Sequence, residues 1–307
     1  MKTVLFVGAG RHQRRPIEHA RARLRVVAVD RTERAPGLAS ADAAEVVEFT
    51  DVGAVVEVGH RHGVDGVLTV SADRAVPVAA AVAEELGLPG IGRATAHLMT
   101  HELEMRDMLA AAGVPQPRYA RLRSESDVER ALEAVGLPAV LKPVDSGGQR
   151  AVFRIESADD LRGNATEAIS ESPTGEAIVE AFVDGLELNG IAIARGGDVA
   201  LGAEVGDDLA LPQFSQPLAI RFFTAEPGPP PTGRVVSVGS LEPVLAAEGV
   251  VQADTYLDLG ETIRPVRRDG DRRGYVIAIA DDTDEARRRT DDAASLLLVE
   301  VEAGLAA

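Results

Sequence analysis

The sequence contains no cysteine and no tryptophan, and aromatic residues make up only 3% of it. The absence of cysteine excludes disulfides, thiolate nucleophiles and cysteine-based zinc sites, so nothing indicates a secreted disulfide scaffold and we expect a cytoplasmic protein. Long apolar runs are also scarce. The run 3–10 is too short to cross a bilayer and leads into a glycine turn, so we expect no membrane association.

Basic residues are few: 32 Lys and Arg stand against 49 Asp and Glu, which gives a formal net charge of -17. Nucleic acids and anionic membranes require a basic surface, so we expect neither as a partner and favour small-molecule substrates. Hydrophobic residues make up 45% of the 307 positions. This is enough apolar material for two or three compact domains.

Lysine is the scarcest basic residue, since Lys2 and Lys142 are the only two, against thirty arginines. A position that needs only positive charge would carry arginine in such a chain. Lysine differs from arginine as a compact point charge on a flexible stem. Lys142 therefore needs a specific explanation.

Residues 1–93 alternate short β-branched runs with helical stretches, which predicts a parallel-sheet α/β domain with ligands at the carboxyl ends of its strands. The expected strands are 4–7, 26–29, 46–49 and 66–70, and the expected helices are 16–24, 52–62 and 75–86.

Residues 94–217 have an α+β pattern with more antiparallel pairing. We expect one amphipathic helix over 94–112, a buried strand at 139–142, and capping boxes at Ser126 with Glu129 and at Ser157 with Asp160. Residues 218–307 predict a small β-rich lobe with a final helix from Asp284. Its expected strands are 218–223, 234–238, 255–259 and 274–280.

The segment 141–148 has the features of a phosphate-binding loop. A buried strand ends in the cation Lys142, and the small residues Ser146, Gly147 and Gly148 follow. Such a loop exposes backbone N–H groups that can wrap phosphate oxygens. The alternative is an ordinary hairpin turn with a lysine at its edge.

A second segment, 178–187, could supply the other half of a nucleotide site. Its apolar strand carries Glu180, Phe182 and Val183, and Glu187 follows a glycine turn. Free backbone groups of such a strand can bond the adenine edge, and a carboxylate can hold the ribose hydroxyls.

Together these motifs resemble the ATP-grasp superfamily, and the segment 1–93 resembles the domain that precedes the ATP-grasp domain in biotin carboxylase and related ligases. The resemblance implies that Lys142 contacts ATP phosphates, Ser146 to Gly148 close over them, Glu180 to Val183 meet adenine, and Glu187 binds ribose. It also implies magnesium and a reaction in which ATP activates a carboxylic acid as an acyl phosphate that an amine then attacks.

Two departures from the family pattern support an alternative function. Glu102 stands where the family usually places a lysine, and a carboxylate there would repel phosphate. After Phe214 the chain passes directly to Pro217, without the usual Glu-x-Asn-x-Arg strand of magnesium ligands. The metal ligands are therefore unknown, and the alternative is a catalytically impaired relative that binds a nucleotide or a protein partner.

Further residues leave alternatives open. Gly8 and Gly10 with Asp30 could indicate a dinucleotide fold, although Gln13 replaces the third glycine of that pattern. Arg221 and Arg273 could each bind a substrate carboxylate or simply lie on a sheet surface. Glu187 and Asn189 could form a metal pair. A homodimer is also possible.

Overall fold

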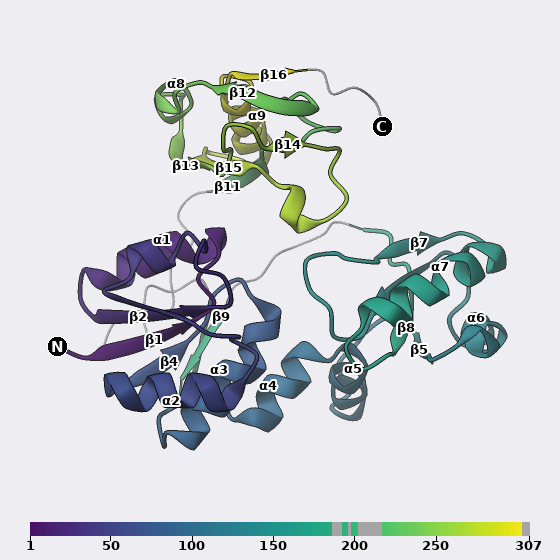
Figure 1. The fold of residues 1–307 in the computed structure, drawn as a ribbon. Coiled ribbons are helices and arrows are strands. Elements are labelled where there is room, and N and C mark those ends of the chain that lie inside the picture. The colour runs from purple at the N-terminus through teal and green to yellow at the C-terminus, as the bar shows by residue number, and fades with distance from the viewer. Residues whose placement is uncertain (186–191, 196–197, 202–216, 303–307) are drawn as a thin grey trace. The chain divides into compact units, whose positions relative to one another are not determined.

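The computed structural model describes residues 1–185, 192–195, 198–201 and 217–302 (Figure 1). Contacts divide the chain into two compact units, Met1–Val183 and Asp184–Ala307, here called unit 1 and unit 2. The division into 1–93, 94–217 and 218–307 stays a prediction. In the described ranges, none of the helices has the length and apolar character needed to cross a membrane.

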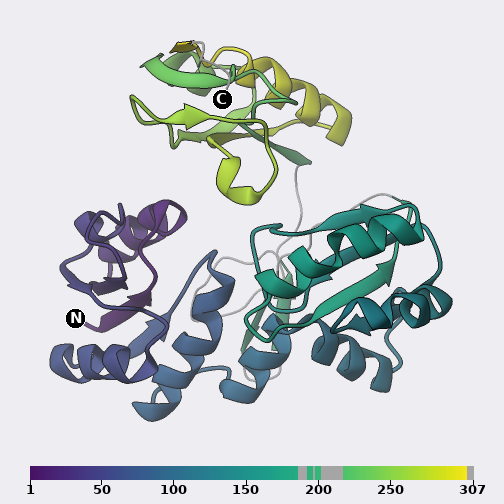
Figure 2. The ribbon, with the colours of Figure 1, turned by 45° about the vertical axis from the view of Figure 1, so that its right-hand side comes forward.

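The first half of unit 1 is a four-stranded parallel sheet in the order β3-β2-β1-β4, with helices on both faces (Figures 1 and 2). Leu5 and Val7 pack with α2 and α3, whereas Phe6 packs with α1 through Ile17. This alternation is why β1 is buried on both faces. The elements are β1 Thr3–Val7, α1 Arg11–Arg21, β2 Arg25–Asp30, β3 Ala43–Val46, α2 Val52–His62, β4 Gly66–Leu68 and α3 Val76–Glu85, with 3-10 turns at Leu38–Ser40 and Asp73–Ala75.

The helix expected at 52–62 is confirmed because both of its ends carry strong local signals. The Asp51 side chain accepts a hydrogen bond from the Ala54 N–H, and Gly63 has φ 58° in the left-handed region. The expectation for 16–24 was less accurate, since α1 begins at Arg11, directly after Gly10. The third strand also ends at Val46 rather than beginning there.

The second half of unit 1 is an antiparallel sheet in the order β5-β8-β6-β7. Helices α6 and α7 pack on one face around Leu141 and Val179, and α5 meets the sheet through Leu103, Val144 and Ile178. The elements are α4 Arg93–Thr100, α5 Glu102–Ala111, β5 Tyr119–Leu122, a 3-10 turn at Glu125–Asp127, α6 Val128–Val135, β6 Ala139–Pro143, β7 Phe153–Ile155, α7 Ala158–Glu171 and β8 Ala177–Ala181.

The single helix expected over 94–112 is two helices, so that prediction was wrong. His101 is extended, with φ -122° and ψ 100°, and its Nδ1 accepts a hydrogen bond from the Glu104 N–H at 3.4 Å. The Glu102 N–H donates to the Val144 carbonyl at 2.7 Å. This bond to a distant segment fixes the start of α5, and helical periodicity alone does not reveal it.

One of the two expected helix caps is confirmed. The Ser157 hydroxyl accepts a hydrogen bond from the Asp160 N–H at 3.1 Å. The box expected at Ser126 and Glu129 is instead formed by Ser124 and Asp127. Both pairs have the same spacing, so the sequence pattern could not distinguish them.

Unit 2 contains two three-stranded antiparallel sheets, β11-β15-β13 and β14-β12-β16, and β9 pairs with β10. Helix α9 packs against β11 and β15 around Val276 and Ala293. The strand expected at 255–259 was wrong, because β13 ends at Thr255. The elements are β9 Ala192–Arg195, β10 Asp198–Leu201, β11 Leu218–Phe222, β12 Gly233–Val238, α8 Glu242–Leu245, β13 Val250–Thr255, β14 Thr262–Ile263, a 3-10 turn at Asp269–Asp271, β15 Gly274–Ile279, α9 Thr283–Ala294 and β16 Val299–Glu302.

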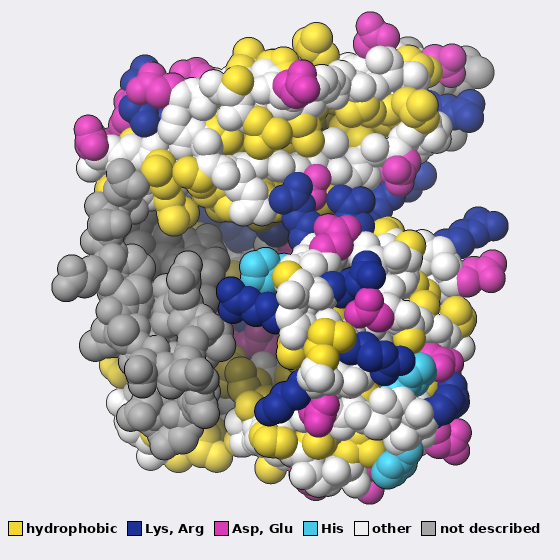
Figure 3. Space-filling model, turned by 90° about the vertical axis from the view of Figure 1, so that its left-hand side faces the viewer, with side chains coloured by type: hydrophobic (Ala, Val, Ile, Leu, Met, Phe, Trp, Pro, Cys, Tyr) yellow, Lys and Arg dark blue, Asp and Glu magenta, His cyan; other side chains and the backbone are white. Residues whose placement is uncertain are grey.

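The expected combination of a parallel α/β sheet, an antiparallel α+β region and a β-rich lobe is confirmed. The surface agrees with the low basic content of the chain. On the face shown in Figure 3, Lys and Arg side chains lie among Asp and Glu side chains.

Candidate functional site

Lys142 lies near the end of β6, where Leu141 is fully buried and Lys142 pairs in register with Ile178 of β8. Its Nζ is 3.0 Å from Glu180 Oε2 and 3.2 Å from Glu102 Oε1. The side chain is 21% exposed. The structure thus brings Lys142 and Glu180 together, as expected for two halves of one site, and adds Glu102 as a second anionic neighbour.

Glu180 is the most buried charged group here, with a side chain only 8% exposed. Its Oε1 accepts a hydrogen bond from Arg106 Nε at 2.6 Å. Burial alone would raise the pKa of Glu180, but the Arg106 hydrogen bond and the charge of Lys142 outweigh it, so the pKa lies below its ordinary value. Glu180 is therefore a carboxylate that orients both cations.

The loop after β6 has an irregular backbone. Gly148, Gln149 and Ala151 have φ of 76°, 57° and 50°, which is the left-handed region that non-glycine residues rarely adopt. Arg150 stabilises this shape because its guanidinium donates to the Gly147 carbonyl at 3.1 Å and to Ser146 Oγ at 3.0 Å. Left-handed turns of this kind can point successive N–H groups toward an anion.

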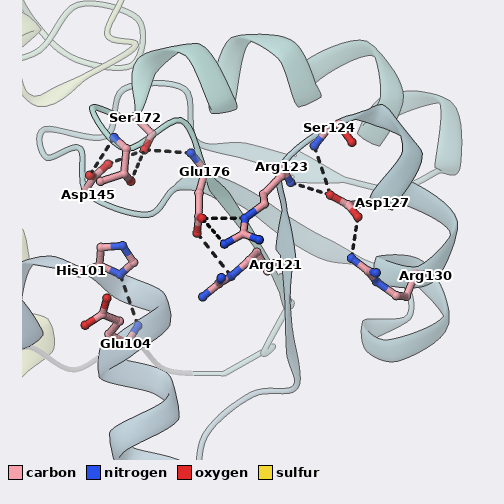
Figure 4. Close-up of polar contacts among 11 residues, drawn as sticks. His101, Glu104, Arg121, Arg123, Ser124, Asp127, Arg130, Asp145, Ser172 and Glu176 are labelled. Carbon is pink, nitrogen blue, oxygen red and sulfur yellow. Dashed lines mark hydrogen bonds and ion pairs between the residues drawn. The ribbon is translucent and has the colours of Figure 1, made fainter.

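The beginning of the same loop is held by a neighbouring turn. Asp145 accepts hydrogen bonds from the Ser172 hydroxyl at 2.5 Å and from the Thr174 N–H at 3.2 Å (Figure 4). Ser146 also donates to Glu171 Oε1 at 3.3 Å. These contacts tie the loop to the end of α7, so Ser146 and Gly147 have defined positions.

A cavity of about 410 Å³ lies beside the loop, entirely within unit 1. Its walls include Asp73, His101, Glu102, Ser146 and Gly147. Glu102 lines the cavity, whereas the lining does not include Lys142. An anion in this cavity would therefore meet Glu102, whose carboxylate contacts Lys142.

Gly147 approaches the first half of unit 1 very closely. A Cβ atom at this position would lie 1.9 Å from Asp73 Oδ2, which is far too close for two nonbonded atoms. Only glycine fits while the loop and Asp73 keep these positions. Asp73 therefore lies against the candidate phosphate loop.

The candidate adenine strand leaves the sheet after β8. The Phe182 N–H donates to the Pro138 carbonyl at 3.0 Å, and the Arg154 guanidinium lies 4.3 Å from the Phe182 ring centroid. Val183 is 69% exposed. Glu187, the expected ribose ligand, lies outside the described residues, as does Asn189.

The two arginines selected in the C-terminal lobe have different surroundings. Arg221 lies on β11 with a side chain 40% exposed and is 3.4 Å from Asp291 of α9. Arg273 is 7% exposed, lies 3.1 Å from Glu261, and donates to the Gly270 carbonyl at 2.9 Å. This burial contradicts the alternative that Arg273 lies on the surface. Its contacts indicate that it stabilises the fold of the C-terminal lobe.

A magnesium site finds no support in the described ranges. Within 1–185, 192–195, 198–201 and 217–302, no group of three or more His, Asp or Glu side chains could hold a metal ion. Asp30, the ribose candidate of the dinucleotide alternative, is 8% exposed and accepts hydrogen bonds from the Ala9 and Thr32 N–H groups. Its carboxylate is therefore engaged in holding the Gly8 turn.

Arg106 was not among the residues predicted from the sequence, although it pairs with Glu180 at the centre of the site. A signal was present: Arg106 follows Glu102 by one helical turn, so both side chains point from the same face of α5. Arg150 and Glu171 were also missed, because their contacts with the loop depend on tertiary structure.

Comparisons with known proteins give a consistent result. A family model described as L-amino acid ligase C-terminal domain 2 matches residues 221–302. The formate-dependent phosphoribosylglycinamide formyltransferase of Synechococcus sp. strain CC9605 is 32% identical over 215 residues, which cover 67% of this chain and 54% of that protein. The crystal structure of L-amino acid ligase from Bacillus licheniformis has a TM-score of 0.75 at 15% identity, covering 99% of both chains.

The chain belongs to the ATP-grasp superfamily. A further ATP-grasp neighbour is the biotin carboxylase domain dimer of Hydrogenobacter thermophilus 2-oxoglutarate carboxylase, solved with MgADP and bicarbonate; its TM-score is 0.68 at 14% identity, covering 97% of this chain and 90% of that one. The chain spans about half the length of the curated relatives it matches. Membership thus accounts for the fold.

Proposed function

We propose that this chain is an ATP-dependent ligase that joins a carboxylic acid to an amine through an acyl phosphate. The observation that carries the proposal is the position of Lys142 beside Glu180 and immediately before the irregular loop 145–151. The similarity to ATP-grasp ligases in sequence and fold supports it. An acid oxygen would take the terminal phosphoryl group, ADP would leave, and the amine nitrogen would then displace phosphate.

In this proposal each part of the site has a binding or positioning role. Lys142 contacts phosphate oxygens, and backbone N–H groups of Ser146 to Gly148 surround them. Glu180 orients Lys142, and the strand from Glu180 to Val183 contacts adenine, with Glu187 at the ribose. Catalysis then depends on holding the reactants in line and on excluding water.

The acid-binding arginine is assigned to Arg221 in preference to Arg273. Its guanidinium is 40% exposed and its ion pair is a surface contact at 3.4 Å, so a substrate carboxylate can compete for it. Arg273, which is itself buried, would have to give up the Glu261 carboxylate and the Gly270 and Arg272 carbonyls. No magnesium-dependent step is assigned, because the described residues do not fit the ion.

The test is release of ADP and phosphate when ATP is supplied with panels of carboxylic acids and amines. We expect release that requires both substrates and falls about 100-fold in Lys142→Ala, by analogy with the loss of one preorganised donor. Lys2→Ala removes the other lysine of the chain and is the matched control. ADP release that is equal in wild type and Lys142→Ala would contradict the proposal.

A second candidate function is a nucleotide-binding or partner-binding module without ligase activity. It is favoured by the Glu102 contact with Lys142, which places a carboxylate where phosphate would bind. ATP binding without turnover of any acid and amine pair would support it, and acid- and amine-dependent ADP release would contradict it. Light scattering of the same samples tests the possible homodimer.

A further inference from the structure

The charges around Lys142 balance one another. Arg106 and Lys142 are the cations, and Glu102 and Glu180 are the anions, joined in a chain of contacts of 2.6, 3.0 and 3.2 Å. Their side chains are between 8% and 32% exposed, so water screens these contacts only in part. A site with no net charge from these four groups offers little attraction to a polyphosphate.

The two carboxylates differ in what holds them. Glu180 is 8% exposed and has a second partner, Arg106, which remains if Lys142 moves away. Glu102 is 32% exposed, and among the described residues its carboxylate pairs with Lys142. Glu102 is therefore the contact that an incoming anion can displace, whereas Glu180 stays in place.

A backbone hydrogen bond holds Glu102 close to Lys142. Its N–H donates to the Val144 carbonyl at 2.7 Å, just two residues beyond Lys142 in the chain. The extended conformation of His101 directs the start of α5 to this point. Glu102 also lines the cavity together with Ser146 and Gly147, and its carboxylate contacts Lys142.

We propose that the Glu102 carboxylate competes with nucleotide phosphate for Lys142. Glu102 thereby determines how tightly the site binds a nucleotide and how strongly it distinguishes AMP, ADP and ATP. The inference rests on the proposed function, in which ATP phosphate meets Lys142. A phosphate oxygen must replace the Glu102 carboxylate, and the displaced carboxylate then repels it. Because repulsion grows with ligand charge, Glu102 weakens ATP binding more than ADP binding, and ADP binding more than AMP binding.

If Glu102 served only to stabilise α5, its charge would act through the helix dipole and not through Lys142. An acidic residue in the first turn of a helix interacts favourably with the helix dipole, and Glu104 shares that turn. Glu104 lies 3.0 Å from His97 instead of contacting Lys142. Glu104→Gln is therefore the matched control, because it removes the same charge from the same helix turn without releasing the lysine.

The experiment is isothermal titration calorimetry of AMP, ADP and ATP with wild type, Glu102→Gln, Glu104→Gln, Lys142→Ala and the double variant Glu102→Gln/Lys142→Ala. We expect Glu102→Gln to bind ATP about tenfold more tightly, with a smaller gain for AMP. Glu104→Gln should stay within about twofold of wild type. In the Lys142→Ala background the gain should be clearly smaller, because the repulsion by Glu102 remains but the competition for the lysine is gone. Circular dichroism checks that each variant is folded.

The variants separate failure of this inference from failure of the proposed function. Equal ATP affinity of wild type and Lys142→Ala shows that phosphate does not use the lysine, and this overturns the proposed function. If Lys142→Ala weakens binding but Glu102→Gln does not strengthen it, only the competitor role is overturned. An equal gain in Glu104→Gln, or a gain that is undiminished without Lys142, would also overturn that role, since either indicates a general charge effect.

Discussion

Lys142 and Arg273 are two poorly exposed cations whose partners differ in kind. Arg273 donates to backbone carbonyls of Gly270, Arg272 and Thr262 and lies beside Glu261. The Lys142 contacts are instead with the side-chain carboxylates of Glu102 and Glu180. Backbone carbonyls cannot turn away without deforming the chain, whereas a carboxylate can rotate to another partner. The comparison teaches that Arg273 is suited to hold a fold, and Lys142 to exchange partners.

The largest effect should come from removing the structural cation. Arg273→Ala removes the buried donor of three backbone carbonyls and the cation beside Glu261, so we expect the free energy of unfolding to fall by about 3–5 kcal/mol. Urea denaturation followed by circular dichroism measures this change. A loss below about 1 kcal/mol would show that the carbonyls find other donors and would remove the contrast with Lys142.

A smaller effect is expected at the buried carboxylate of the exchangeable site. Glu180→Gln keeps the shape of the side chain but weakens two charge-assisted contacts, and we expect a loss of about 2 kcal/mol at neutral pH.

The same carboxylate should make stability depend on pH. Because the folded pKa of Glu180 lies below its ordinary value, its contribution is present above the unfolded pKa of about 4.3 and is lost as the pH falls through the folded pKa. The difference between wild type and Glu180→Gln should therefore shrink in acid. A difference that stays constant from pH 7 to pH 3 would contradict the ionised role of Glu180.

The smallest stability effect should come from the exchangeable cation itself. In Lys142→Ala, Glu180 keeps Arg106 and Glu102 can reach solvent, so we expect the free energy of unfolding to change by less than about 1 kcal/mol. Nucleotide affinity should change far more than stability. The same urea titration measures this change. A large loss of stability in Lys142→Ala would show that Lys142, like Arg273, holds the fold.

Local signals in the sequence predicted much of the fold. Helix α2 was predicted with its observed bounds, and in the structure Asp51 and Gly63 mark its ends. The break at His101 could not be predicted, since it depends on the Glu102 N–H finding the Val144 carbonyl. A helix pattern does not show which backbone group a distant strand will offer.

The candidate site was predicted in part for a similar reason. Lys142 and Glu180 could be selected from strand and loop patterns, and the structure places them 3.0 Å apart. Glu102 was identified as an unfavourable neighbour for phosphate, but its contact with Lys142 was not foreseen. Arg106 was not selected, because its role depends on α5 packing against β8.

The rarity of lysine has a practical consequence for chemical labelling. Lys2 is exposed near the chain start, whereas the Lys142 ammonium is flanked by two carboxylates and is 21% exposed. An amine-reactive reagent thus has just two lysine side chains to modify, and their peptides are readily distinguished by mass spectrometry. The extent of modification at Lys142, with Lys2 as the internal standard, would report directly on whether a ligand, a carboxylate or solvent occupies the space around that amine.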